Sequence, residues 1–477
     1  MFYALKSSAS EDFMEYIIAV IAVLQGALCF RLLGPDRNRV VYLLYLEIIY
    51  NLFVKFLVGF AGLPSLLNYA GDAILLWILV EFVLQHRRAP RKIPKSMLIF
   101  GGILLGLTLL SYALNRYSPL LYLWGLRNNF RFVLFAMMCA VYLEKKDIKH
   151  LSDILFGFLI TNILVMTWQY FCVPCDRWSP GDFISGLYSN GPFRGGNEAI
   201  SWLVCMVCTL EAVRYLQEDG CKPWRMLLSW GGSAYLAGLA EIKLIFPQLL
   251  MIAVLAVLLC KKSRRSLWLL LTTGISVFLG IQLLYQLYPA FDDFFNPDTM
   301  NDYVTRDDLY PGIPDATEAP VTPGTPAEPS EPVTGPGINR MTAIPYMLEH
   351  FLLTWPRKLF GIGLGNGDFS SFSWLTSDFY RQYHNIRYTY FSSAMVVLEL
   401  GIVGLIAYGL WFFNFLRRAF FLRPRDDADR IIRPTVVILA LMVYVMILCN
   451  QTMKLETSAY LVGFVLSFPF LTEGEKK

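Results

Sequence analysis

Long apolar stretches separated by short polar segments run through most of this chain. About thirteen of them reach or approach the length of roughly 20 residues that a helix needs to cross a membrane. They lie near residues 13–33, 40–60, 70–86, 96–114, 120–143, 151–172, 197–217, 226–241, 244–260, 266–288, 391–416, 433–450 and 455–472. A helix satisfies its own backbone hydrogen bonds in lipid, so the pattern predicts an all-α, polytopic transmembrane helix bundle of about 12–13 spans.

The two stretches at 226–241 and 244–260 are short for perpendicular spanning helices, which need roughly 20 residues. They meet at Glu241-Ile242-Lys243. We expect either two short helices that join there or one helix with a re-entrant break.

Basic residues are distributed unevenly between the connecting segments. Five segments are rich in Lys and Arg and fall on one side of the bundle if all the stretches are spans: 31–39, 86–95, 144–150, 261–265 and 417–433. Cytoplasmic loops carry an excess of Lys and Arg, so this side is predicted to be the cytoplasm. The alternation predicts an N-terminus outside and a C-terminus inside.

One long polar segment, 289–390, divides the chain into a transmembrane part at 1–288 and a second one at 391–477, which ends in a short cytoplasmic tail. The segment is predicted to lie outside the membrane, where substrate would be met. Its first part is aromatic and acidic, and 311–337 holds eight prolines, which predicts a disordered insert without chemistry. From Asn339 the pattern predicts an amphipathic helix that ends before Trp355-Pro356.

The composition agrees with a membrane protein: 56% of the residues are hydrophobic, 16% are charged and the mean hydropathy is +0.47. The net charge of +4 reflects the cytoplasmic loops, so we expect the lipid bilayer and no nucleic acid as a partner. Most of the nine cysteines lie in or at apolar stretches and are expected to pack there, whereas Cys172 and Cys175 could form a disulfide outside.

Three short motifs occur in a fixed order on the predicted outer side. The first is Gly191-Pro192-Phe193-Arg194-Gly195-Gly196-Asn197, which opens a span, and the second is the turn Gly361-Ile362-Gly363-Leu364-Gly365. The third is Glu399-Leu400-Gly401-Ile402-Val403-Gly404, which enters the next span. Together with the number of spans and one late outer loop, they resemble the O-antigen ligase and O-antigen (capsular polysaccharide) polymerase family of bacterial envelope glycan assembly.

The resemblance implies a C-type glycosyltransferase-like fold and an enzyme of the bacterial cytoplasmic (inner) membrane whose active site faces outside. Such an enzyme transfers a glycan from a polyprenyl (undecaprenyl) pyrophosphate donor to a saccharide acceptor, either as a polymerase of repeat units or as a ligase. It needs no cofactor or metal, and polysaccharide-assembly proteins are its expected partners. The donor leaves an anionic pyrophosphate at the outer interface, so the protein should place fixed cations at that depth.

Arg127 and Arg131 meet this requirement best. They lie in the outer third of the 120–143 stretch, and their spacing of four residues places both on one helix face. Arginine at membrane depth usually faces a polar cavity or a partner. The alternative is that both side chains extend toward the outer headgroups.

Other cations and amides are candidates for binding the pyrophosphate or the glycan. They are Arg194, Asn197, Lys243, Arg340 and Arg387. For Asn197 the alternative is a helix cap, and for Lys243 it is an internal ion pair with Glu241, which needs a break in the helix because the two are only two residues apart.

Three residues are candidates for catalysis. His384 can be neutral near neutral pH and could act as a general base on an acceptor hydroxyl. Many members of the family place a His-Asn pair about eleven residues before the glycine that matches Gly401, which in this chain falls on Tyr390. Either an insertion has shifted the pair to His384-Asn385, or other groups replace it. Glu399 is a candidate carboxylate, with orientation of the loop as its alternative role.

The turn 361–365 does not match a dinucleotide-binding loop, because no predicted strand precedes it. Its glycines are expected to let the backbone approach the membrane or the donor closely. No Walker motif and no acidic metal cluster occurs. The remaining alternative is a secondary transporter or flippase of lipid-linked saccharide, although no internal repeat of the kind common in transporters is visible.

Overall fold

The computed structural model describes most of the chain. It covers residues 8–34, 37–85, 87, 89–173, 181, 184–189, 196–261, 263–288, 338–370 and 372–474. Across these ranges the chain forms helices and no strands. The aromatic and proline-rich parts of the long polar segment, Arg194 and Cys175 lie outside the described residues.

A helix coincides with each of the apolar stretches. The long helices are α1 (Ser8–Leu32), α2 (Arg39–Gly59), α3 (Ala70–Gln85), α4 (Lys95–Asn115), α5 (Pro119–Tyr142), α6 (Asp147–Cys172), α7 (Asn197–Gln217), α8 (Pro223–Leu239), α9 (Ile245–Leu259), α10 (Arg264–Leu287), α15 (Ser392–Phe420), α16 (Asp427–Cys449) and α17 (Glu456–Leu466). The all-α prediction is therefore confirmed for the described part of the chain.

Nine of the described helical segments are long and apolar enough to cross a membrane. The difference from the expected 12–13 has a physical cause in each case. Helices α8, α9 and α17 are only 17, 15 and 11 residues long. Helix α5 is long enough at 24 residues, but a polar run that contains Arg127 and Arg131 interrupts its apolar character. The described fold is compatible with a multi-pass membrane protein.

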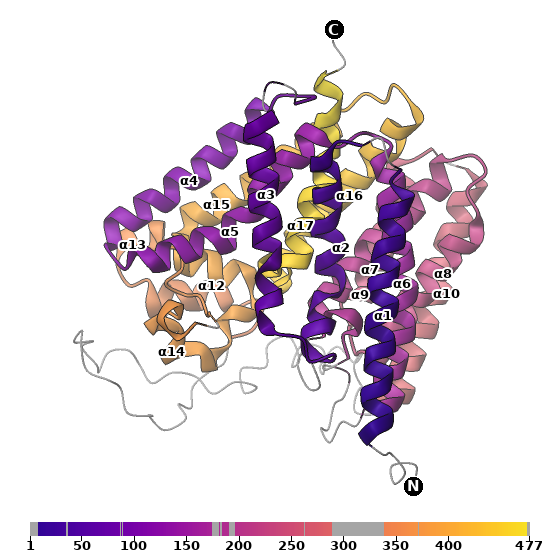
Figure 1. The fold of residues 1–477 in the computed structure, drawn as a ribbon, viewed down its shortest axis with the longest axis horizontal. Helices are drawn as coiled ribbons and strands as arrows, with labels where there is room; N and C mark the ends of the chain where they lie inside the picture. The colour runs from indigo at the N-terminus through magenta and orange to yellow at the C-terminus, as the bar shows by residue number, and fades with distance from the viewer. Residues whose placement is uncertain are drawn as a thin grey trace.

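Helix α7 lies at the centre of the bundle and packs against α6, α8, α9 and α16 (Figure 1). Nearly all of its side chains are buried, as expected of a helix that is hydrophobic on every side. Helices α1, α3, α4 and α10 lie at the periphery and expose many large apolar side chains. Such a surface suits lipid contact better than water.

Connecting segments that were predicted to share a side of the membrane contact one another. On the predicted cytoplasmic side, Arg37 pairs with Asp147, and the Lys145 Nζ lies 2.9 Å from Asp426. On the other side, Gln451 donates to Glu198 at 3.2 Å. The long-range contacts therefore follow the alternation of the predicted loops.

The polar region at 338–391 folds against the first half of α15, at the left of Figure 1. It contains α12 (Ala343–Tyr346), a π-helical turn η6 (Met347–Phe351), α13 (Trp355–Phe360), α14 (Asp378–Tyr383) and the 3₁₀ turns η7 (Ser373–Leu375), η8 (His384–Ile386) and η9 (Tyr388–Tyr390). The predicted amphipathic helix is thus short and ends in a π-turn before Leu352. Further 3₁₀ turns are η1 (Ser65–Tyr69), η4 (Gly186–Tyr188), η10 (Thr452–Lys454) and η11 (Phe468–Gly474).

Helix α15 is broken at Gly401, where φ is 69° and ψ is −170°. A residue with a side chain rarely adopts this conformation, and the break separates the first turns of α15 from the rest of the helix. It places the backbone of Leu398 and Glu399 where a second chain segment can bind to it.

Candidate functional site

The glycine-rich turn is the segment that binds to the broken end of α15. Ile362 N–H donates to the Leu398 carbonyl at 2.9 Å, and Gly363 N–H donates to the Glu399 carbonyl at 3.0 Å. Gly361 has a φ of 71°, and a methyl group there would collide with the backbone of Glu399. A methyl group at Gly401 would collide with α13 in the same way. Both glycines are required because two backbones approach closely.

The opposite face of the turn packs on α5. A methyl group at Gly125 would lie 2.6 Å from the Gly365 nitrogen, and one at Gly365 would collide with the Leu121 carbonyl. The Tyr117 hydroxyl donates to the Leu364 carbonyl at 2.7 Å. The glycines therefore bring the turn against the protein's own helices, where the sequence suggested an approach to the membrane or the donor.

The Glu399 side chain holds this turn in place through hydrogen bonds to its backbone. It is 1% exposed, and its Oε1 accepts hydrogen bonds from the Gly365 nitrogen at 3.0 Å and the Gly367 nitrogen at 3.3 Å. Its Oε2 accepts from the Lys454 Nζ at 3.3 Å. The structure therefore gives Glu399 the orienting role that the sequence left as an alternative.

Lys454 connects the turn to the bundle and was missed by the sequence reasoning. Besides Glu399, its Nζ donates to Asn129 Oδ1 at 2.7 Å and lies 3.9 Å from Asp368 Oδ1. Burial lowers the pKa of this ammonium, but Glu399 and Asp368 together raise it above its ordinary value. The sequence feature that could have pointed to Lys454 is a single lysine in the four-residue loop 451–454, between two apolar stretches.

Asp368 extends the network to the arginines of α5. Its Oδ2 accepts from Asn128 Nδ2 at 3.0 Å, and Asn128 Oδ1 accepts from the Arg127 guanidinium at 2.8 Å. Arg127 Nε in turn lies 3.1 Å from both carboxylate oxygens of Asp72, in the first turn of α3. A continuous polar network thus runs from Glu399 to Asp72.

Arg127 and Arg131 share this carboxylate, since Arg131 also reaches Asp72 at 3.4 Å. The Arg127 guanidinium lies over the rings of Trp124 and Tyr69, with its central carbon 4.7 and 5.3 Å from the ring centroids. The side chains of Arg127 and Asp72 are 22% and 31% exposed, whereas that of Arg131 is 9% exposed. The pair therefore reaches from the interior of the bundle to its accessible edge.

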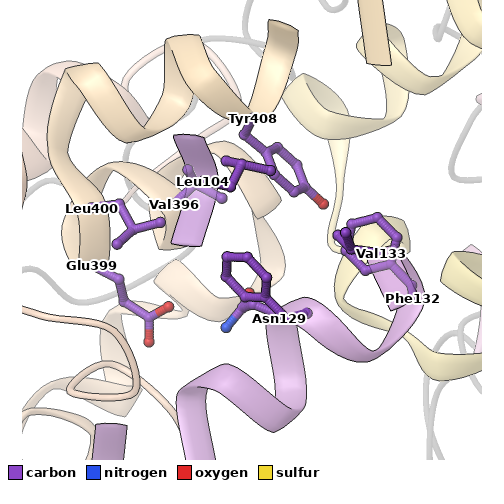
Figure 2. Close-up of a pocket in the computed structure, with 9 residues that line it drawn as sticks. Leu104, Asn129, Phe132, Val133, Val396, Glu399, Leu400 and Tyr408 are labelled. Atoms are coloured by element: carbon purple, nitrogen blue, oxygen red, sulfur yellow. The ribbon is translucent and has the colours of Figure 1, made fainter. Parts of the chain in front are cut away.

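A small pocket lies on the bundle side of the network (Figure 2). Its lining includes the polar side chains of Glu399, Asn129 and Tyr408, and the other lining residues are Leu104, Phe130, Phe132, Val133, Val396 and Leu400. It has room for about one water molecule. The pocket is therefore too small for a sugar.

The predicted catalytic residues are not brought together. His384 and Tyr390 are exposed, and no hydrogen bond or ion pair among the described residues joins either of them to the buried Glu399. Arg387 is also exposed and lies 5.8 Å from the Tyr390 ring centroid. Tyr388, in the same segment, does reach the network, and the sequence did not indicate it.

Tyr388 is fully buried, and its hydroxyl donates to the Gly367 carbonyl at 2.6 Å. Burial raises the pKa of this phenol, and the nearby carboxylates of Asp368 and Glu399 raise it further. The phenol therefore stays neutral and keeps its hydrogen bond. It follows Arg387, which adopts a left-handed conformation with φ of 57°.

The other predicted binding residues within the described part of the chain have partners elsewhere. Lys243 pairs with Glu241 at 3.3 Å, across a break where Glu241 has a φ of 57°. Asn197 donates to the carbonyls of Gly181 and Ala240, each at 3.3 Å, while Gly196 rather than Asn197 is the cap of α7.

Arg340 donates to the Cys449 carbonyl at 3.0 Å and so binds the C-terminal end of α16, where a cation is favoured. In the described part of the chain, no group of three or more His, Cys, Asp or Glu side chains is placed to hold a metal ion. No protein-family model matches the chain, and no curated protein matches it.

Proposed function

We propose that this protein transfers a glycan from a polyprenyl pyrophosphate donor to an acceptor saccharide on the outer side of the bacterial cytoplasmic membrane, as a polymerase or a ligase. The observation that carries the proposal is the arginine pair on α5. Two guanidinium groups one turn apart share the carboxylate of Asp72, beside an accessible edge of the bundle.

The leaving group of such a reaction is a diphosphate anchored by lipid. Guanidinium groups bind phosphate oxygens through two parallel hydrogen bonds and keep their charge at every relevant pH. Asp72 holds Arg127 and Arg131 in place before the donor arrives, and its partial exposure lets a diphosphate take over some of these contacts. The pair then stabilises the negative charge that develops as the glycosidic bond breaks.

The acceptor hydroxyl needs a base, and His384 is the proposed one. Its Nδ1 lies 3.2 Å from the Tyr380 carbonyl, an arrangement in which Nδ1 carries the hydrogen and Nε2 keeps a lone pair. The ring is exposed and stacks on Tyr380, with centroids 5.5 Å apart. A neutral imidazole in this tautomer can accept a proton from a saccharide hydroxyl.

A flippase or secondary transporter of lipid-linked saccharide is the second candidate. Its support is the interruption of the helices: α15 breaks at Gly401, and α8 and α9 meet at the left-handed Glu241. Broken helices that meet ionised side chains are typical of transporter sites. The difference between the two candidates is chemical, because a transporter leaves its donor intact.

The test uses the purified full chain in proteoliposomes with an undecaprenyl-pyrophosphate-linked glycan. Release of undecaprenyl pyrophosphate together with a lengthened or transferred glycan is expected. Arg127→Ala and Arg131→Ala should each slow the release about 100-fold, as removal of a group that stabilises developing charge does. The control is Arg430→Ala, which removes an exposed arginine from the opposite end of the bundle. Movement of unchanged donor across the membrane would refute transfer and favour the flippase.

A further inference from the structure

Four aromatic rings lie in a row next to the arginine pair, and together they form what we call the aromatic strip. In order they are Trp374, Phe372, Tyr69 and Trp124, with ring centroids 6.0, 5.6 and 6.5 Å apart. They come from three separate parts of the chain: the segment at η7, the end of η1 and helix α5. The fold therefore assembles the strip from distant residues.

The strip differs from the aromatic core of the protein in its exposure. Trp374 is 63% exposed and Phe372 is 42% exposed, while Tyr69 and Trp124 are half-buried. Its inner end carries the Arg127 guanidinium, which lies over both Tyr69 and Trp124. An accessible row of rings thus begins at the cation that would hold the diphosphate.

Aromatic residues at a membrane interface usually act as separate anchors around the perimeter of a bundle. The rings of the strip instead contact one another and lead to the Arg127 guanidinium. The face of an aromatic ring carries partial negative charge and attracts C–H groups that are polarised by neighbouring oxygens, as those of a sugar ring are. A saccharide joined to a diphosphate matches both the row of rings and the guanidinium at its end.

We infer that the aromatic strip is the binding site for the saccharide part of the diphosphate-linked donor, with the sugar next to the diphosphate on Tyr69 and Phe372 and the following one toward Trp374. This inference rests on the proposed function, because it assumes a diphosphate at Arg127. It assigns Phe372 and Trp374 as specificity-determining contacts that touch the glycan and take no part in bond breaking.

A second aromatic series links this site to His384. The Trp124 indole nitrogen donates to the Phe369 carbonyl at 3.4 Å, the Phe369 ring lies 5.2 Å from Tyr380, and Tyr380 stacks on His384. Phe369 is 56% exposed. A glycan on the strip would therefore lie on the same accessible surface as the proposed base, as a transfer reaction requires.

The experiment measures equilibrium binding to the full chain in nanodiscs with two kinds of probe. One is undecaprenyl pyrophosphate without sugar, and the other is the same lipid carrying one N-acetylglucosamine or one galactose. The double substitution Phe372→Ala and Trp374→Ala should weaken binding of the sugar-bearing probes about fivefold or more, from the loss of two stacking contacts. Binding of the sugar-free probe should be unchanged.

Two further variants make the outcomes distinct. Trp355→Ala removes a tryptophan that is 76% exposed on α13, and it should affect neither probe. Arg127→Ala should weaken both probes equally, and an unaltered affinity for both would refute the proposed function itself. If the double substitution weakens both kinds of probe equally, the strip contacts lipid or headgroups, and the inference is wrong. No loss with either sugar also overturns it.

Discussion

The ion pair between Lys454 and Glu399 supports a sharp test of how the glycine-rich turn is held. We consider Lys454→Met, Glu399→Gln and the double substitution. Methionine keeps the length of the lysine side chain but removes its charge. Glutamine keeps an oxygen that can accept from the Gly365 and Gly367 nitrogens, which lie 3.0 and 3.3 Å from Glu399. The single and double variants form a double-mutant cycle, which isolates the interaction between the two charges.

The magnitude follows from burial. Glu399 is 1% exposed, so Lys454→Met leaves an uncompensated buried carboxylate, which costs about 3–5 kcal/mol of the free energy of unfolding. Glu399→Gln should cost less, since the Lys454 ammonium keeps Asp368 at 3.9 Å. The lost hydrogen bond from Lys454 to Asn129 cancels in the cycle because it is absent from both variants that lack the lysine. We expect a coupling energy of about 2 kcal/mol.

The assay is reversible unfolding of the purified protein in mixed micelles by titration with a denaturing detergent. The matched control is the cycle Lys146→Met and Glu144→Gln, whose side chains are 59% and 55% exposed and should couple by less than about 1 kcal/mol. If the double substitution at Lys454 and Glu399 costs the sum of the single ones, the two charges are not coupled, and the connection of the turn to the bundle through Lys454 is wrong.

Three further predictions concern the same region. Gly361→Ala should lower the free energy of unfolding by at least about 1–2 kcal/mol, because Gly361 has a positive φ and lies close to the backbone of α15. The control Gly102→Ala, at an open helical position, should not lower it. Equal detergent-unfolding midpoints for the two variants would contradict this. Asp72→Asn should tighten binding of undecaprenyl pyrophosphate about fivefold, because the competition of Asp72 for the arginines outweighs its positioning of them; weaker binding would show the opposite balance. Because the pKa of Lys454 is raised on folding, the contribution of its charge is complete below the ordinary lysine pKa and is lost only as pH rises through the raised value. Between about pH 8 and pH 10, thermal midpoints should therefore show no loss from this ammonium, and a loss in that range that Lys454→Met abolishes would refute the assignment.

The positions of the helices could be predicted from the sequence because each apolar stretch is a local signal. Even the short pair α8 and α9 was expected, together with a junction at Glu241 and Lys243. The break in α15 was not expected, since Gly401 lies within a continuous apolar run and a single glycine is tolerated in a helix. The reason that this position needs a glycine is the close approach of the α13 backbone, which a local sequence pattern does not indicate.

The partners within the site could not be predicted, because they depend on contacts between distant parts of the chain. The spacing of Arg127 and Arg131 predicted a shared helix face, but nothing local indicated that Asp72 would meet them there. For the same reason Lys454 and Asp368 were overlooked, although both are charged residues near apolar segments. A buried charge needs a partner of opposite charge. The sequence shows that such a charge lies in or near an apolar stretch, but it does not show which distant residue pairs with it.

The polar network also explains how the helices can hold the proposed site in position. Lys454 lies between α16 and α17, Asn129 on α5 and Glu399 on α15, so a single ammonium ties three helical elements together. Glu399 in turn orients the turn that carries Asp368, and Asp368 binds Asn128 next to Arg127. A displacement of the turn would therefore move the arginine that we propose to hold the diphosphate. Stability and donor binding should change together when Lys454 is altered, whereas Phe372 and Trp374 should affect binding alone.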